Sequence, residues 1–205
     1  MLKFKKLNLV FAILLLSFSV IAQKKLQLGS TAPDFSGFNQ KGKTINLYSE
    51  LKDGPVVLLF YRGNWSEDCM NFLIKVQDSL DEIGQKQASV IAVTPEGLKG
   101  MEKTISKTKA KFKLVTDHDA EIMKLYDVEH KADHHFINQL KIKGTDLKEL
   151  NETNGTYLPV PALFVIGKNK KINYVFFEAD YSKRPNISDF IDLIQTSMSS
   201  GFKKK

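Results

Sequence analysis

The chain of 205 residues contains a single cysteine, Cys69, within residues 60–70, which read FYRGNWSEDCM. A thiol acts as a nucleophile in its thiolate form, which is favoured near a helix N-terminus and near cations. If Ser66 is the N-cap of a helix, Cys69 is the third helical residue and the stretch supplies this environment. We therefore expect the Ser66 hydroxyl to accept a hydrogen bond from an amide of the first turn, and Arg62 to supply the cation.

Two neighbouring carboxylates oppose this chemistry. Glu67 and Asp68 stabilise the start of a helix but disfavour a thiolate beside them. A second interpretation is that Cys69 is a small apolar side chain packed in the core, as cysteines often are. Local chemistry leaves both interpretations open. In either case the absence of a second cysteine excludes a disulfide within one chain.

The elements around Cys69 predict that it lies at the end of a central strand. Residues 56–61, VVLLFY, are apolar without alternation, which is typical of a strand covered on both faces. Residues 62–65 are predicted to form a loop, and residues 66–83 one helix that Gly84 ends. Open α/β sheets bind ligands at the carboxyl ends of such strands.

Helices and strands alternate along the rest of the chain. Hydrophobic periodicity and turn residues predict further strands at 34–38, 44–47, 89–93, 112–116, 161–166 and 172–177, the last two as a hairpin. Further helices are predicted at 96–107, 120–126 and 187–198. Residues 129–157 are polar and weakly periodic, and we expect an irregular surface excursion there. The pattern predicts an α/β fold with a mixed central β-sheet flanked by helices.

Residues 1–22 have the order of a secretory signal peptide. Lys3, Lys5 and Lys6 precede an apolar stretch with an A-x-A-like ending at Ala22. The alternative is an uncleaved membrane anchor, but the apolar stretch falls short of the roughly 20 residues that a span needs. We expect cleavage after Ala22 and export of the mature chain, either to the periplasm or out of the cell.

The mature chain, residues 23–205, is predicted to be one domain without a nucleic-acid partner. The net charge of +7 falls to +4 once the three signal-peptide lysines are removed, and Lys203–Lys205 carry three of the remaining charges. The folded body is then near neutral, whereas a nucleic-acid surface needs a concentrated basic patch.

No metal or cofactor is expected. His130 and His134 would share a face of a helix, with Asp133 and His135 between and beside them, which is one spacing of metal ligands. The surrounding segment is polar and irregular, however, and a solvated excursion explains these residues more simply.

Four motifs spread along the chain resemble the AhpC/TSA redoxin family, the peroxiredoxin-like branch of the thioredoxin-like superfamily. They are APDF at 32–35, FYRGNW at 60–65, LPVP at 158–161 and DYSKRP at 180–185. The resemblance covers about residues 28–194. It implies a thioredoxin-like fold and, in active members, reduction of a hydroperoxide by a cysteine that becomes a sulfenic acid.

The resemblance also implies roles for single residues. Peroxiredoxins carry Pro-x-x-x-Thr/Ser-x-x-Cys, so Ser66 takes the position of the hydroxyl that orients peroxide, Cys69 that of the peroxidatic cysteine, and Arg62 stands where the proline is expected. The later arginine of peroxiredoxins has no evident counterpart. Arg184 is the remaining candidate for a guanidinium near the site, although an exposed arginine before a helix is the simpler interpretation.

Two further residues are expected to shape the substrate pocket. Trp65 ends the FYRGNW motif and either lines the pocket or packs to lock the loop. Pro161 resembles the cis-proline that lies beside the active-site helix of thioredoxin, so we expect a cis bond between Val160 and Pro161.

A comparison with dithiol members of the family gives a less favourable picture. These members read Tyr-Arg-Gly-x-Trp-Cys-Pro-Tyr-Cys, whereas here Ser66 replaces the first cysteine and Glu67-Asp68 replaces Pro-Tyr. If the first position holds the nucleophile, as in thioredoxin, this chain lacks it. Dithiol–disulfide exchange by one chain is therefore excluded.

Two functional hypotheses follow. The first is an exported thiol peroxidase in which Cys69 attacks the peroxide, Ser66 orients the peroxide and Arg62 stabilises charge. An external thiol reductant then resolves the oxidised cysteine. The protein is either a monomer or a homodimer under this hypothesis. The alternative is a catalytically degraded thioredoxin-like fold that binds a partner through the same cleft. A monothiol protein that forms mixed disulfides with a disulfide substrate lies between the two. A sulfur buried under apolar side chains would favour the degraded fold.

Overall fold

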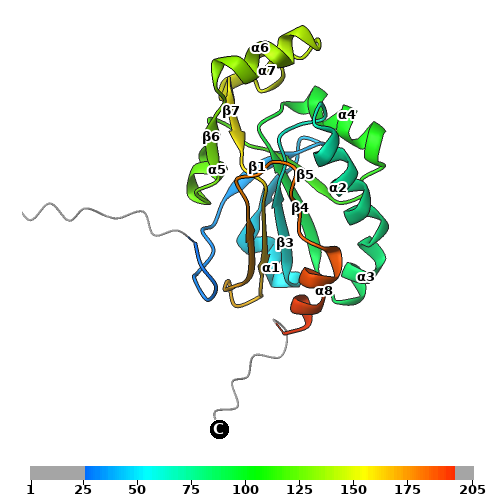
Figure 1. Ribbon diagram of the computed structural model, residues 1–205. Coiled ribbons are helices and arrows are strands. Elements are labelled where there is room, and N and C mark those ends of the chain that lie inside the picture. Colours follow the sequence, from blue (N-terminus) through cyan, green and yellow to red (C-terminus); the bar gives the residue numbers. More distant parts are fainter. Residues whose placement is uncertain (1–25, 197–205) are drawn as a thin grey trace, which may run out of the picture.

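The structure is a computed structural model that describes residues 26–196 (Figure 1). The expected signal peptide at 1–22 lies outside this range, as do both ends of the expected domain 23–205. A seven-stranded sheet has the strand order β2-β1-β5-β4-β3-β8-β9. The central strand β3 (Val56–Phe60) pairs in parallel with β4 (Ser89–Thr94) and antiparallel with β8 (Ala162–Ile166). The predicted mixed sheet is therefore confirmed.

The remaining strands extend this sheet on both sides. β5 (Lys113–Thr116) runs parallel to β4, and β1 (Ser36–Asn39) pairs antiparallel with β5 and with β2 (Thr44–Asn46). On the other side, β9 (Ile172–Phe177) forms the expected antiparallel hairpin with β8.

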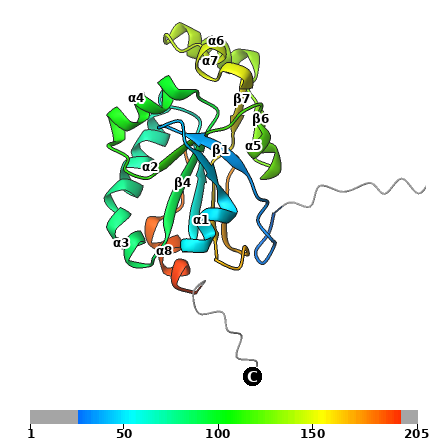
Figure 2. The same ribbon diagram turned by 180° about the vertical axis from the view of Figure 1, so that it is seen from behind.

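Helices cover both faces of the sheet (Figures 1 and 2). α1 (Leu47–Asp53) and α5 (Glu121–Leu125) contribute to the core on one face. Four others contribute to the core on the opposite face: α2 (Glu67–Asp78), α3 (Leu80–Gln85), α4 (Leu98–Thr108) and α8 (Ile187–Thr196). Along β3 the side chains alternate between the two cores, which explains why residues 56–61 are apolar without a polar face.

Two helices differ from the prediction. The helix expected over 66–83 is divided into α2 and α3 at Ser79. α1 was not predicted, although it carries sequence signals of a helix. Asn46 caps its N-terminus by accepting a hydrogen bond from the Ser49 amide, and the buried Leu47 and Leu51 lie one turn apart.

Residues 129–159 lie outside the main sheet, as expected of an excursion, but they form a small folded lobe, so the expected irregular structure was wrong (Figure 1, yellow-green to yellow). The lobe contains β6 (Glu129–Lys131), α6 (His134–Ile142), α7 (Leu147–Leu150), the 3-10 turn η1 (Glu152–Asn154) and β7 (Tyr157–Pro159), with β6 and β7 paired antiparallel. Its core buries Ala132, Leu140, Leu147 and Leu158. Asp133 and Asp146 cap the two helices through their side chains.

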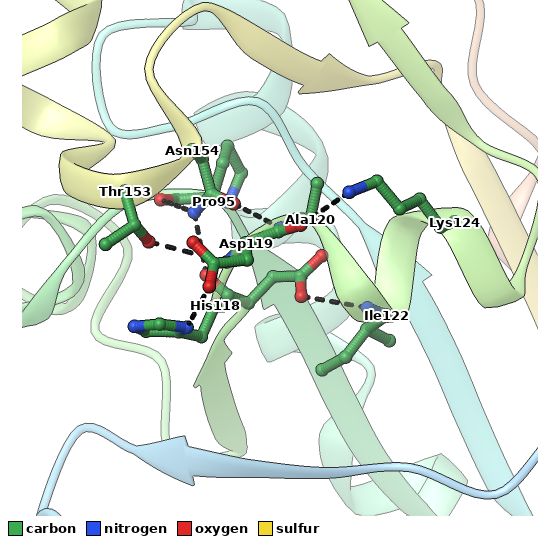
Figure 3. A network of polar contacts seen from close by, with 9 residues as sticks. Pro95, His118, Asp119, Ala120, Ile122, Lys124, Thr153 and Asn154 are labelled. Carbon is green, nitrogen blue, oxygen red and sulfur yellow. Dashed lines mark hydrogen bonds and ion pairs between the residues drawn. The ribbon is translucent and has the colours of Figure 1, made fainter.

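A network of polar contacts ties the lobe to the carboxyl edge of the sheet (Figure 3). The Asn154 amide donates to the carbonyls of Pro95 and Asp117 at 2.8 and 2.7 Å, and its oxygen accepts from the Ala120 amide at 2.6 Å. The Thr153 hydroxyl accepts a hydrogen bond from the Asp119 backbone amide. The Asp119 carboxylate in turn contacts the His118 ring. The loops after β4 and β5 are therefore joined to the lobe through buried hydrogen bonds.

Within residues 26–196, no helix has both the length and the apolar character needed to cross a bilayer.

Candidate active site

Cys69 is the third residue of α2, at the carboxyl end of β3, as the sequence predicts. Ser66 is the N-cap with an extended backbone, but its side chain makes no capping hydrogen bond, so the expected bond from its hydroxyl is absent. The helix starts instead with the Met70 amide donating to the Ser66 carbonyl at 3.0 Å. Because capping does not use it, the Ser66 hydroxyl has no partner within the first turn.

Two N–H donors reach the sulfur of Cys69, one from the preceding loop and one from a distant part of the chain. The backbone amide of Arg62 lies 3.4 Å from Sγ, and Nη2 of Arg184 lies 3.3 Å from it. The other guanidinium nitrogen, Nη1, donates to the carbonyls of Tyr181 and Lys183, both at 2.7 Å. Arg184 is thus held over the thiol and is not the exposed arginine of the simpler interpretation.

The sulfur is nevertheless buried. Cys69 is 2% exposed and belongs to the core beneath α2. A small pocket adjoins it, lined by Phe60, Tyr61, Cys69, Phe72, Pro161, Ala162, Leu163, Phe176, Arg184 and Pro185. By exposure alone this burial favours the degraded fold, whereas the two donors on the sulfur are an arrangement that stabilises a thiolate.

The guanidinium of Arg62 lies among aromatic rings and not on the sulfur. Its Cζ is 4.1 Å from the ring centroid of Tyr181, 4.6 Å from that of Phe136 and 5.0 Å from that of Trp65. Arg62 is 7% exposed, and its Nε has no hydrogen-bond partner in the part of the chain that the structure describes. Burial lowers the pKa of Arg62, and cation–π contacts with the three rings offset the lost hydration. The group of Arg62 that lies within hydrogen-bond distance of Sγ is its backbone amide, while the guanidinium interacts with Cys69 only through its charge.

The two expected pocket residues lie in different places. Pro161 lines the pocket beside Cys69, as expected, but every described peptide bond is trans, so the cis bond expected at Val160–Pro161 is wrong. Trans is the preferred form of X–Pro bonds in general. Trp65 packs against Arg62 and Phe136 at the join between the loop and the lobe, outside the pocket.

A buried carboxylate beneath the loop was missed by sequence reasoning. Glu96, in the loop after β4, is fully buried, and it accepts the Asn64 backbone amide at 2.8 Å and the Asn64 side-chain amide at 2.7 Å. Burial raises the pKa of Glu96 to about 7, although the hydrogen bonds from Asn64 act in the opposite direction. The sequence signal that could have identified Glu96 is an acidic residue two positions after the buried strand β4, which runs parallel to β3.

Gly63 makes the close approach of Glu96 and the loop feasible. Its φ of 142° lies in a region that favours glycine. A Cβ at Gly63 would lie 2.6 Å from both Glu96 Oε1 and Trp65 Nε1, and a Cβ at Gly100 would lie 2.6 Å from Glu96 Cβ. Both glycines leave the space that the Glu96 side chain occupies.

Among residues 26–196, no group of three or more His, Cys, Asp or Glu side chains is placed to hold a metal ion.

Two buried carboxylates are expected to make stability decrease as pH rises. Burial raises the pKa of Glu96 from 4.5 to about 7 and that of Asp117 from 3.8 to about 6. The folded chain then keeps protons that the unfolded chain releases, so the free energy of unfolding falls between about pH 4 and about pH 7 and levels off above. Each shift of more than two pKa units corresponds to about 3 kcal/mol at most.

Urea unfolding between about pH 5 and about pH 8 checks this expectation. Asp117→Asn should flatten the lower part of the dependence. The exposed Asp133, Asp146 and Asp180 have a lowered pKa and act in the opposite sense, but only at more acidic pH. A free energy of unfolding that rises over the same interval would contradict the assignment.

Comparison with known proteins places the chain in a family. The AhpC/TSA family profile matches residues 28–175. A chloroplastic peroxiredoxin Q of Oryza sativa subsp. japonica is 24% identical over 172 residues, which are 84% of this chain and 68% of that protein. Peroxiredoxin Bcp of Bacillus subtilis is 26% identical over 103 residues, which are 50% of this chain and 65% of that protein.

Solved structures share the fold at low sequence identity. Peroxidoxin BcpB of Mycobacterium tuberculosis matches with a TM-score of 0.64 and 19% identity over 83% of this chain and 97% of its own. A yeast mitochondrial 1-Cys peroxiredoxin matches with a TM-score of 0.63 and 22% identity over 82% of this chain and 75% of its own. These likenesses establish a thioredoxin-like fold of the peroxiredoxin type. Together with the family match over most of the chain, they confirm the resemblance seen in the motifs: the protein belongs to the AhpC/TSA family.

Proposed function

We propose that the chain is an exported peroxidase that reduces a hydroperoxide through the single thiol of Cys69 and is restored by an external thiol. Its family and its relatives are those of peroxiredoxin-like oxidoreductases. The observation that carries the proposal is the pair of N–H donors, from Arg62 and Arg184, that converge on the sulfur at a helix N-terminus. A cysteine that served only to fill the core would need neither donor.

The chemistry assigned to Cys69 is a displacement at oxygen. The thiolate attacks the terminal oxygen of ROOH, an S–O bond forms and the O–O bond breaks. The alkoxide leaves and takes a proton to give ROH, while the sulfur is oxidised to a sulfenic acid. Arg184 and the Arg62 amide stabilise the negative charge on sulfur before attack. The family motif makes the Ser66 hydroxyl our candidate for a hydrogen bond to the peroxide, although Ser66 lines a separate cleft with Trp65 and Glu67 and not the small pocket beside Cys69.

The return step needs electrons from outside the chain. One external thiol attacks the sulfenic sulfur, releases water and forms a mixed disulfide, and a second thiol then reduces that disulfide and restores Cys69. Cys69 cannot use an internal partner, because the chain has no other cysteine.

Mass spectrometry of the mature protein after brief exposure to hydrogen peroxide tests the proposal. We expect Cys69 to gain one oxygen in proportion to peroxide consumed, and to be trapped as a sulfenic acid by a dimedone-type reagent. Cys69→Ser should neither consume peroxide nor carry the label. Equal peroxide consumption by wild type and Cys69→Ser would end the peroxidase proposal. The mass of the exported chain also tests the location, because cleavage after Ala22 leaves Gln23 as the first residue.

The burial of Cys69 supports one second candidate, a redox-inactive fold that binds a partner. At 2% exposure the sulfur offers almost no surface to a substrate. The same peroxide experiment separates the candidates, because an inactive fold leaves Cys69 reduced.

A further inference from the structure

We propose that Glu96 is a positioning residue for Cys69: it anchors the loop 62–66 so that the Arg62 amide points at the sulfur. The inference deepens the proposed function and rests on it for its biological meaning. Its evidence is the contact geometry of four residues: Glu96, Asn64, Arg62 and Cys69.

Glu96 anchors Asn64 through two hydrogen bonds. Both carboxylate oxygens are used, one by the Asn64 backbone amide at 2.8 Å and the other by the Asn64 side-chain amide at 2.7 Å. Asn64 is buried, and its carbonyl accepts from Lys107 Nζ at 2.7 Å. The residue in the middle of the loop is therefore held on both sides of its peptide, from the loop after β4 and from α4.

Asn64 in turn fixes the direction of the Arg62 amide. Only Gly63 separates the two residues, and its φ of 142° sets the loop in a conformation that most residues avoid. Glycine adopts this φ without strain, so Gly63 alone does not fix the loop, and the two bonds from Asn64 to Glu96 hold it in place. The Arg62 amide at the start of this loop is the donor 3.4 Å from Sγ.

The anchor is also isolated from water. Glu96 is fully buried, and its own amide donates to Thr94 Oγ1 at 3.3 Å. The charged and titratable groups that face it are Lys103 and Lys107 from α4 and Tyr61, the residue after β3. Glu152 of η1 lies against the adjacent Gly97. Among residues 26–196 no cation forms an ion-pair contact with Glu96, and a buried carboxylate without such a contact is costly, so its place under the active-site loop calls for a role.

The inference predicts that loss of the Glu96 carboxylate makes thiolate formation at Cys69 harder, whereas a simple charge effect would make it easier. In Glu96→Gln, one acceptor oxygen replaces two, so the Asn64 side-chain amide must turn over to keep a bond, and both bonds lose the charge that strengthens them. The anchor of the loop is therefore weakened. We expect the Arg62 amide to leave the sulfur and thiolate formation to become harder. If Glu96 acted only through its negative charge, its removal would instead make thiolate formation easier.

The experiment measures how fast the single thiol reacts with iodoacetamide as a function of pH. This reaction needs no peroxidase activity, so it tests the inference even if the peroxide experiment fails. We expect the midpoint of the profile to move to higher pH by about one unit in Glu96→Gln, which makes alkylation about tenfold slower near neutral pH. Fluorescence of Trp65, the single tryptophan of the chain, should change as well, because Trp65 Nε1 borders the same space as Glu96.

Asp117→Asn is the matched control. Asp117 is 1% exposed and also accepts two amide bonds, from Ile122 and Met123 at 2.9 Å each, but these belong to α5 and not to the loop. It should destabilise the fold comparably and leave the alkylation profile unchanged. Asn64→Ala removes one of the two bonds without touching Glu96 and should move the midpoint in the same direction by a smaller amount.

A folded Glu96→Gln protein whose midpoint is unchanged, or lies at lower pH, would overturn the inference. If Glu96→Gln does not fold, Asn64→Ala decides: a wild-type midpoint in that variant would overturn it equally. A shift in Asp117→Asn as large as that in Glu96→Gln would reduce the effect to general destabilisation and would also overturn it.

Discussion

Arg184→Met is expected to slow the reaction of Cys69 with hydrogen peroxide by about thirtyfold. The substitution removes the guanidinium whose Nη2 lies 3.3 Å from Sγ. A hydrogen bond to a charged group contributes about 2 kcal/mol, and this amount corresponds to about thirtyfold in rate when the bond stabilises the reacting thiolate. Stopped-flow fluorescence of Trp65, or direct measurement of peroxide consumption, gives the second-order rate constant.

Lys183→Met is the matched control for this prediction. Lys183 is the preceding residue and carries the same charge, but it is exposed and pairs with Glu178 at 3.7 Å. Its loss should change the rate by less than about twofold, because exposed ion pairs are screened by water. Arg184→Lys should recover little, since an ammonium group cannot bond the sulfur and two carbonyls in the fixed geometry of a guanidinium. Equal rates for Arg184→Met and Lys183→Met would remove Arg184 from the mechanism.

Arg62→Ala is expected to lower the free energy of unfolding by about 3 kcal/mol, the largest stability effect that we predict for a single side chain of the site. The guanidinium lies 4.1–5.0 Å from three ring centroids, which come from the loop, the lobe and the segment before α8. Truncation leaves a void among these rings and removes the cation–π contacts. Urea unfolding followed by circular dichroism measures the change independently of the nearby tryptophan.

Two further variants interpret the result. Arg62→Met keeps much of the volume but no charge, and we expect it to lose about 1–2 kcal/mol, which separates ring packing from the cation–π contribution. Lys131→Ala is the control, because the Lys131 ammonium lies 5.8 Å from the Tyr157 ring on an exposed side chain and should contribute little. An Arg62→Ala protein as stable as Lys131→Ala would show that the rings hold together without the cation.

Much of the sheet and the place of the cysteine could be predicted from the sequence. The continuous apolar run before Arg62 has a physical cause, since side chains on both faces of β3 enter a core. The start of α2 next to Cys69 follows from the acidic residues of its first turn. The capping bond of Ser66 was predicted wrongly, because the position of an N-cap residue does not determine where its hydroxyl points.

The partners of the sulfur could not be predicted from the sequence with the same certainty. Arg184 is 115 residues from Cys69 in the chain, and Glu96 is 32 residues from Asn64. Contacts of this kind depend on which loops meet at the edge of the sheet, and one sequence without its fold does not specify that.

The lobe was missed for a different reason. Its helices are short and have few apolar residues, so their hydrophobic periodicity is weak. The N-cap residues Asp133 and Asp146 were therefore the stronger sequence signals that helices begin there.

The lobe also implies that opening motions are distributed unevenly over the molecule. Its core holds four buried residues, whereas the two cores of the main sheet hold twenty each. Regions with few buried apolar contacts open with a lower free energy than the global unfolding free energy, so we expect the amides of the lobe to exchange with solvent by sub-global opening. Phe136 of α6 lies on the guanidinium of Arg62. Each such opening therefore uncovers the cation beside the active-site loop while β3 and its neighbours in the sheet remain protected.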